Sequence, residues 1–447
     1  MGLIRRIWRR LPVRAIAGAF LVLGAIAGIV GLFRSAGDLP WAMAARISAP
    51  APPAAEPVSK DEVRQLLDES AFNNLTETSF TLPAEGRVLK IETTLDVDLQ
   101  SYLLDKIDRQ NSRHVGIVVM EAATGRILAM AGFDKFDTSA NPCLRSDFPA
   151  ASIFKIVTAA SAVDQCGYTA DSPVRFNGYK HTLYKRQLTE AVNRYTTTVS
   201  FREAFAESVN PVFGKLGELR LRKSLLEKSA DAFGFNEPLE FDLPLPPSQF
   251  HVNDEPYHWA EVASGFNRDT TISPLHGAMM ASAVLNGGTM VEPSIVDRIV
   301  DEHGEILYRR QAGRGRQAMS ARAASALSQM METTIDSGTG RKAFRKYRQD
   351  KVLSRLQIGG KTGSIDSRSH DVRYDWFVGF ARERQGQDAV VVAVMVGHEK
   401  YIGIRATQYA RMAMTYYFGN PPGKDLLPSV PASGSASKKV LTPYRPT

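Results

Sequence analysis

Apolar residues recur with two different periods along this chain. Near its start, a run at 87–94 and two shorter runs at 116–120 and 126–131 predict strands. The last two are joined by Ala122-Ala123-Thr124-Gly125, which indicates a hairpin. Three more strands are predicted near the other end, at 356–360, 376–381 and 389–396.

Between these two groups of strands the apolar residues take a helical period. Helices are predicted at 96–110, 224–233 and 320–335, and another at 405–417 follows the last strand. Strands therefore bracket a helical centre. This order predicts an α+β fold, in which one antiparallel sheet is built from both ends of the body and flanked by helices, with a mostly helical subdomain between them.

The pattern also divides the chain into parts. The body is predicted at 87–420, and the segment 59–86 before it is expected to be a short helical one. Ser59 and Glu62 form the signature of a capping box at the start of that helix. After residue 420 the tail at 421–447 is rich in Pro, Ser and Lys, a composition that predicts disorder.

The amino-terminal segment predicts a membrane anchor. Residues 15–33 form an uncharged apolar run, long enough to span a bilayer as a helix, and the basic segment 1–14 precedes it. This charge imbalance predicts a cytoplasmic amino terminus and a single-pass protein of the plasma (inner) membrane, with its body outside the cytoplasm. The Pro/Ala-rich segment 34–58 is expected to be a stiff linker. A cleaved signal peptide is the alternative, because Ala42-Met43-Ala44 fits a cleavage site.

Charge and cysteine content narrow the function classes. The formal net charge is +8, and five of these charges are arginines within residues 1–14, so nucleic-acid binding is not implied. The two cysteines, Cys143 and Cys166, are too few for a disulfide framework or a cysteine-rich metal site. An exported protein permits either one disulfide between them or two free thiols.

Ser152 and Lys155 are the first candidates for chemistry. Ser152 stands where an apolar helix is predicted to begin, and Lys155 lies one turn later on the same face. A hydroxyl needs a base to become a nucleophile, and a lysine of lowered pKa can serve. The alternative is a capping serine with a solvated lysine. Because Phe154 and Ile156 indicate a buried helix, that alternative is disfavoured.

Two further motifs follow in order. Ser208 and Asn210 lie in a predicted loop between helices, where they could relay a proton and bind a substrate amide. The run Lys361-Thr362-Gly363-Ser364 ends a predicted strand, where it could hold a carboxylate and supply an oxyanion-hole amide. Each motif alone is weak evidence for an active site, because ordinary helix caps and a polar turn can have the same residues. The segment 435–438 in the tail also fits Ser-x-x-Lys.

Taken together, these motifs resemble those of the penicillin-binding D,D-transpeptidases, relatives of the serine β-lactamases. The resemblance covers about 88–419. It extends to segments between the motifs, in family order: TTLDVDLQ (93–100), VVMEAATGRILAMAG (118–132), ESVNPVFGKLG (207–217), FGFNEPLEFDLP (233–244), SPLHGAMMASAVLNGGTMVEP (273–293), DSGTGRKAF (336–344), GKTGS (360–364) and DWFVGF (375–380). One departure is Asn267, where relatives often have the second Gly of Gly-x-Gly.

The resemblance implies a role for each motif residue. Ser152 would be acylated by the stem peptide of peptidoglycan, with Lys155 as base and Ser208 as proton shuttle. Asn210 would bind a substrate amide. Lys361, Thr362 and Gly363 belong to the motif that would hold the terminal carboxylate. The backbone amides of Ser152 and Ser364 would form the oxyanion hole.

The resemblance also implies partners. Stem peptides would be the substrate, β-lactams would acylate Ser152, and no metal or organic cofactor is required. Many relatives carry a glycosyltransferase domain, for which the 53 residues between anchor and body leave no room. Glycan polymerisation is therefore not expected of this chain, and a membrane glycan polymerase is suggested as a partner.

Three rival functions share the same serine. A D,D-carboxypeptidase would pass the acyl group to water. A β-lactamase would need a deacylating Glu, and the nearest candidate segment, 237–240, has the wrong spacing and no Asn. A non-catalytic β-lactam sensor would need cytoplasmic apparatus, for which fourteen residues leave no room.

Overall fold

The computed structural model describes residues 59–84, 87–311, 313 and 315–420, all of which belong to the compact unit Glu56–Thr447. The predicted anchor at 15–33, the linker at 34–58 and the tail at 421–447 lie outside the described residues. Among the residues that are described, no helix has the length and apolar character of a membrane span.

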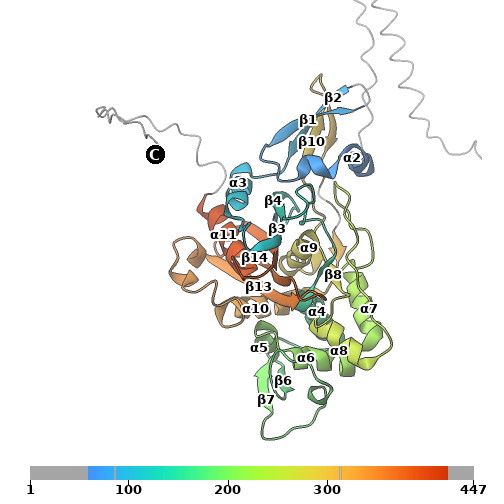
Figure 1. Cartoon of the computed structure of the whole chain (residues 1–447), viewed down its shortest axis with the longest axis vertical. Helices are drawn as coiled ribbons and strands as arrows, with labels where there is room; N and C mark the ends of the chain where they lie inside the picture. The colour runs from blue at the N-terminus through green and yellow to red at the C-terminus, as the bar shows by residue number, and fades with distance from the viewer. Residues whose placement is uncertain (1–58, 85–86, 312, 314, 421–447) are drawn as a thin grey trace, which may run out of the picture. The chain divides into compact units, whose positions relative to one another are not determined.

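A five-stranded antiparallel sheet forms the centre of the body, and Figure 1 labels its strands β3, β4, β13 and β14. The strand order is β13-β14-β15-β3-β4. Its strands are β3 Ser112–Glu121, β4 Ile127–Asp134, β13 Leu356–Asp366, β14 Arg373–Glu383 and β15 Ala389–His398. The early hairpin β3–β4 pairs with the late strands through β15 and β3, where Val392 lies opposite Val119. The prediction of one sheet built from both ends of the body is confirmed for these five strands.

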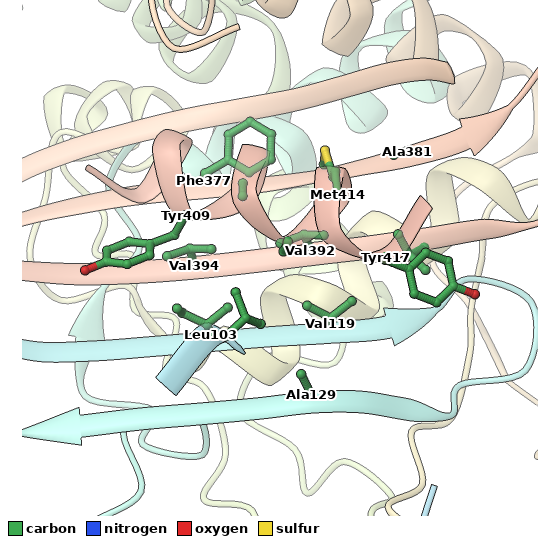
Figure 2. Packing of buried hydrophobic residues seen from close by; sticks show 14 of the residues in the cluster. Leu103, Val119, Ala129, Phe377, Ala381, Val392, Val394, Tyr409, Met414 and Tyr417 are labelled. Atoms are coloured by element: carbon green, nitrogen blue, oxygen red, sulfur yellow. The ribbon is translucent and has the colours of Figure 1, made fainter. Parts of the chain in front are cut away.

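Helices cover both faces of this sheet. α11 (Ala406–Gly419) and α3 (Val97–Lys106) pack on one face, where Tyr409, Met414 and Leu103 enclose a core with Val392 and Val394 (Figure 2). α9 (Pro274–Leu285) packs on the other face. There Gly277 packs against Ala393 and lies so close to Val378 that a side chain would crowd the valine. The alternation of Val392 to one face and Ala393 to the other follows from the two-residue period of a strand.

A second sheet departs from the prediction of a single one. β1 (Ser79–Ala84), β2 (Arg87–Thr93), β10 (Val296–Val300) and β11 (Ile306–Arg309) form a separate four-stranded sheet. The strand predicted at 87–94 exists, but Ile91 pairs with Ile299 and not with the central sheet. The segment at 59–86, predicted to be helical, contains β1 in addition to its helix. Such pairing joins residues about two hundred positions apart, which a local hydrophobic pattern cannot specify.

The helical part lies between β4 and β13. Its helices are α4 Lys155–Cys166, α5 Phe201–Ala206, α6 Asn210–Lys215, α7 Arg222–Ala232, α8 Pro256–Ser264, α9 and α10 Ala321–Asp336. Three two-stranded sheets join this part: β5 Phe148–Pro149 with β8 Thr271–Ile272, β6 Pro173–Phe176 with β7 Thr197–Ser200, and β9 Thr289–Met290 with β12 Arg316–Gln317. The predicted helices at 224–233, 320–335 and 405–417 correspond to α7, α10 and α11.

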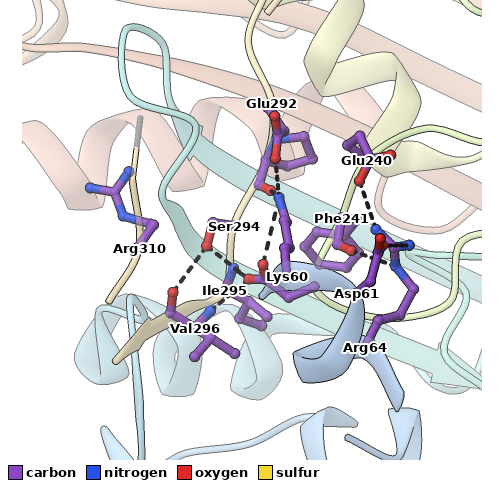
Figure 3. Close-up of polar contacts among 12 residues, drawn as sticks. Lys60, Asp61, Arg64, Glu240, Phe241, Glu292, Ser294, Ile295, Val296 and Arg310 are labelled. Atoms are coloured by element: carbon purple, nitrogen blue, oxygen red, sulfur yellow. Dashed lines mark hydrogen bonds and ion pairs between the residues drawn. The ribbon is translucent and has the colours of Figure 1, made fainter. Parts of the chain in front are cut away.

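An ion-pair cluster attaches helix α2 (Lys60–Leu66) to the body (Figure 3). The ammonium of Lys60 contacts Glu292 and lies 3.6 Å from Oδ1 of Asp242, a fully buried carboxylate. The other carboxylate oxygen of Asp242 accepts hydrogen bonds from the Ser294 hydroxyl and from the amides of Ile295 and Val296. This α2 clamp therefore joins the first described helix to the segment that leads into β10.

Candidate active site

Ser152 lies in a tight turn between β5 and α4. A 3-10 turn, Ala151–Phe154, leads directly into α4, so Ser152 stands at the amino end of that helix as predicted. Ala151 before it has φ +49°, a left-handed conformation that costs an L-residue energy and needs support from its surroundings. Gly265 packs directly against this residue, because a Cβ there would come within 1.9 Å of the Ala151 carbonyl oxygen.

Lys155 is completely buried beside Ser152. Its Nζ lies 2.9 Å from the Ser152 Oγ and 2.8 Å from the Asn210 Oδ1, and it also donates to the carbonyl of Ser264. The Phe213 ring lies 5.4 Å from the ammonium. Since the amine is held by neutral oxygens and an aromatic ring, no carboxylate in this contact set offsets its charge.

The second motif lies where α5 ends and α6 begins, as the loop prediction stated. Ser208 has φ +54°, and Asn210 opens α6 with Pro211 in its first turn. Two backbone carbonyls fix Asn210. Its main-chain N–H donates to the Lys180 carbonyl, and its side-chain Nδ2 donates to the His181 carbonyl. The side-chain oxygen of Asn210 is thereby aimed at Lys155.

The third motif occupies β13, the edge strand nearest the Ser152 turn. The Nζ of Lys361 is buried and donates to the Ser208 Oγ at 3.1 Å and to the Thr362 carbonyl at 2.8 Å. A Cβ on Gly363 would lie 3.2 Å from the Ser152 amide nitrogen, so a side chain there would make the contact between the strand and the Ser152 turn tighter than usual. Thr362 is half-buried and Ser364 is exposed.

The two lysines differ in their electrostatic environment. Burial, and then the charge of neighbouring Lys361, hold the pKa of Lys155 well below its ordinary value. Burial lowers the pKa of Lys361 to about 7. Lys155 is thus the amine that most readily stays neutral and can accept a proton, while Lys361 retains part of its charge near neutral pH.

All three motifs meet in one place. Hydrogen bonds link Ser152 to Lys155, Lys155 to Asn210, and Lys361 to Ser208, over sequence separations of up to 153 residues. Gly363 brings Ser364 next to the Ser152 turn. The competing Ser-x-x-Lys match at 435–438 lies outside the described residues.

Sequence reasoning missed several contacts in this site. The Thr339 hydroxyl lies 2.5 Å from that of Thr362, and the Ser264 carbonyl accepts from Lys155. Thr339 belongs to the DSGTGRKAF segment, so the resemblance could have signalled it, but a lone backbone carbonyl gives no such signal. The unusual Asn267 accepts from the Asp269 and Thr270 amides and so closes the loop that follows Gly265.

Neither cysteine joins the site. Cys143 and Cys166 are both free thiols, which decides between the two states that the sequence left open. Burial raises the pKa of Cys143 to about 12. Within the described ranges, no group of three or more His, Cys, Asp or Glu residues is arranged to hold a metal ion.

The sequence of this chain is similar to those of known proteins. Peptidoglycan D,D-transpeptidase PbpA of Mycobacterium tuberculosis (strain ATCC 25618 / H37Rv) is 26% identical over 318 residues, which cover 64% of this chain and 62% of the relative. Stage V sporulation protein D of Bacillus subtilis (strain 168) is 25% identical over 352 residues, or 70% of this chain and 50% of the relative. The chain therefore spans between half and two thirds of the length of these two relatives.

Solved structures share the fold. The D,D-transpeptidase domain of a peptidoglycan glycosyltransferase from Eggerthella lenta aligns with a TM-score of 0.60 and 23% identity, covering 78% of this chain and 85% of that one. The ceftriaxone acyl-enzyme complex of penicillin-binding protein A from M. tuberculosis aligns with a TM-score of 0.56 and 23% identity, covering 68% and 74%. Residues 115–415 match the family model of the penicillin binding protein transpeptidase domain, and the chain belongs to this family.

Proposed function

We propose that the protein is a serine D,D-transpeptidase that cross-links peptidoglycan stem peptides through an acyl-enzyme on Ser152. The observation that carries this proposal is the contact between the Ser152 hydroxyl and a buried lysine of lowered pKa. A neutral amine 2.9 Å from a hydroxyl is placed to take its proton during nucleophilic attack. Membership of the transpeptidase family and its named relatives support the choice of substrate.

Acylation would begin when the Lys155 Nζ takes the Ser152 proton and the Oγ bonds to the carbonyl carbon of the penultimate D-Ala. The carbonyl oxygen then carries negative charge, which the amides of Ser152 and Ser364 would stabilise. Collapse of this intermediate breaks the C–N bond. The proton that Lys155 took would be relayed through the Ser208 hydroxyl, which contacts Lys361, to the departing nitrogen, so the terminal D-Ala leaves as an amine and Lys155 is neutral again.

Binding of the donor peptide would depend on the third motif and Asn210. Lys361 and Thr362 would hold the terminal carboxylate, since their ammonium and hydroxyl are the cationic and donor groups beside the nucleophile. Asn210 would bind a substrate amide. In the second half-reaction an amine of a neighbouring stem peptide attacks the ester, Lys155 removes its extra proton, and Ser152 leaves as the hydroxyl. β-Lactams, which imitate the D-Ala-D-Ala end, would acylate Ser152 and remain bound, because no acceptor amine frees the Ser152 hydroxyl.

Covalent labelling with a fluorescent penicillin tests the nucleophile. Purified wild-type protein is expected to carry a stable label that survives denaturation, and Ser152→Ala is expected to carry none. Ser435→Ala, which alters the other Ser-x-x-Lys match, is the control and should label like wild type. Labelling that persists in Ser152→Ala would contradict the assignment, and rapid loss of label from wild type would indicate a β-lactamase.

A second assay separates cross-linking from hydrolysis. A pentapeptide donor ending in D-Ala-D-Ala is incubated with and without a D-amino acid as acceptor, and products are identified by mass spectrometry. A transpeptidase yields the peptide joined to the acceptor together with free D-Ala. Release of D-Ala with only the shortened peptide, even at high acceptor concentration, would establish a D,D-carboxypeptidase instead.

The proposed cellular setting rests on the sequence. The apolar run at 15–33 and the arginines before it support a single membrane anchor, with the active site on the extracytoplasmic side. A glycan polymerase in the same membrane would supply the strands to be cross-linked. Removal of residues 1–33 is expected to move the protein from the membrane to the soluble fraction, and retention in the membrane fraction would argue against this anchor.

A further inference from the structure

A buried carboxylate lies directly across the sheet from the last residue of the third motif. Asp375 on β14 is the register partner of Ser364 on β13, and only 5% of Asp375 is exposed. Its Oδ1 accepts a hydrogen bond from the Ser364 Oγ at 3.0 Å. The side chain of Ser364 is therefore attached to a group beneath the sheet edge, although the residue itself is exposed.

Asp375 is itself held from two further elements. Its Oδ2 accepts from the Ala406 amide at 3.0 Å, at the first residue of α11. The Arg405 guanidinium donates to both carboxylate oxygens at 3.3 Å. The Nε2 of His398 on β15 lies 3.8 Å from Oδ2. A carboxylate at a helix amino terminus with a cation beside it is electrostatically favoured, so Asp375 is a fixed anchor point.

The strand that Asp375 anchors is the one that borders the nucleophile. Gly363 stands against the Ser152 amide, with 3.2 Å from its Cβ position to that nitrogen. The next peptide along the strand carries the Ser364 amide. A small rotation of this peptide would change where its N–H points, and donors in an oxyanion hole act only when aimed at the developing charge.

We propose that Asp375 is a positioning residue for acylation: through the Ser364 hydroxyl it fixes the strand segment Gly363–Ser364 whose amide faces the reacting carbonyl. This role rests on the proposed function, because it needs an acyl-enzyme on Ser152. Asp375 touches neither substrate nor nucleophile. It ties the orientation of one oxyanion donor to the start of α11.

The competing role is purely structural, in which Asp375 serves only as a cap and ion-pair partner for α11. Arg405→Gln separates the two roles, because it removes the ion pair and leaves the Ser364 contact in place. The hydroxyl can be tested on its own as well. Ser364→Ala removes it and keeps the backbone amide, whereas Ser364→Thr keeps both.

The experiment measures acylation by a penicillin in stopped flow, which separates the dissociation constant of the first complex from the acylation rate constant. Asp375→Ala and Ser364→Ala are each expected to lower the rate constant about tenfold, less than the loss of a whole oxyanion donor, with the dissociation constant within about twofold of wild type. The double variant should lose no more than either single variant, since both act through one contact. Arg405→Gln should acylate at the wild-type rate, and Ser364→Thr, which keeps the hydroxyl, should recover most of the rate that Ser364→Ala loses.

The outcomes are distinct. Wild-type rates in Ser364→Ala would overturn the positioning role, as would losses that multiply in the double variant or an equal loss in Arg405→Gln. Ser364→Ala alters a surface side chain and decides the question even if Asp375→Ala does not fold. A wild-type protein that no penicillin acylates would overturn the proposed function and this role with it.

Discussion

At the scale of single residues, the site works through two lysines with the same side chain and different surroundings. Lys155 contacts three oxygens, none of which belongs to a carboxylate. Its pKa is lowered by burial and lowered further by the charge of Lys361. The pKa of Lys361 is lowered by burial alone. Their roles need opposite states, because a base must be neutral and a carboxylate ligand must be charged.

This contrast predicts the pH dependence of acylation. Below about pH 7 Lys361 is protonated and can hold a carboxylate, and above it the amine becomes neutral and that attraction is lost. Acylation efficiency is therefore expected to fall on the alkaline side with an apparent pKa of about 7. It should also fall on the acid side, where Lys155 gains a proton. Labelling rates measured across pH check both limbs.

The matched variant for this profile is Lys361→Arg. A guanidinium keeps its charge throughout the accessible range, so the alkaline limb is expected to move upward in this variant while the acid limb stays in place. An alkaline limb at the same position in wild type and Lys361→Arg would assign that limb to another group.

At the scale of elements, the ends of two helices allow a close comparison. Gly265 caps the carboxyl end of α8 with φ +64°, and Gly167 caps that of α4 with φ +72°. The conformations are nearly the same, but their surroundings are not. A Cβ at Gly265 would meet the Ala151 carbonyl, whereas nothing lies within 4 Å of a Cβ at Gly167.

Gly265→Ala is therefore expected to cost more than Gly167→Ala. In Gly167→Ala only the left-handed conformation is unfavourable, which lowers the free energy of unfolding by about 1 kcal/mol. Gly265→Ala adds backbone overlap, so the total is expected to be about 3 kcal/mol, and the displaced Ala151–Ser152 turn should slow acylation as well. Urea unfolding and penicillin labelling measure the two effects. Equal costs in both variants would show that the contact with Ala151 does not constrain the turn.

The elements also differ in how far the local sequence specifies them. The spacing of Ser152 and Lys155 on a buried helix was predictable, because a helix places residues three apart on one face. The strands of the central sheet were predictable from their apolar runs. The second sheet was not, since the pairing of Ile91 with Ile299 depends on distant segments. Nor were the contacts of Lys155 with Ser264 or of Ser364 with Asp375, because they too join separate segments.

At the scale of the whole molecule, the α2 clamp tests how firmly the first described helix belongs to the body. Asp242 is fully buried, and Lys60 with 21% exposure is its ion-pair partner. Lys60→Met leaves this carboxylate without that cation. The loss is expected to be about 2 kcal/mol of unfolding free energy, below the range for fully buried pairs because Lys60 is partly exposed.

Lys223→Met is the control for the clamp. Its ion pair with Asp254 lies on the surface, with 92% of the Asp254 side chain exposed, so no measurable change is expected. Urea unfolding of both variants gives the comparison. A Lys60→Met variant as stable as wild type would mean that Ser294 and the two amides suffice to hold Asp242.

The central sheet has a consequence for how the protein is made. Ser152 follows β4, whereas Lys361 lies on β13. In the sheet, β15 lies between β14 and β3, so it must be in place before Ser152 and Lys361 can face each other. A ribosome delivers β3 and β4 more than two hundred residues before β13, so the early hairpin waits with an unpaired edge that invites aggregation until translation is nearly finished. Nascent chains stalled ahead of β15 should therefore be unable to capture an antibiotic, and reactivity towards penicillin becomes a readout of finished synthesis.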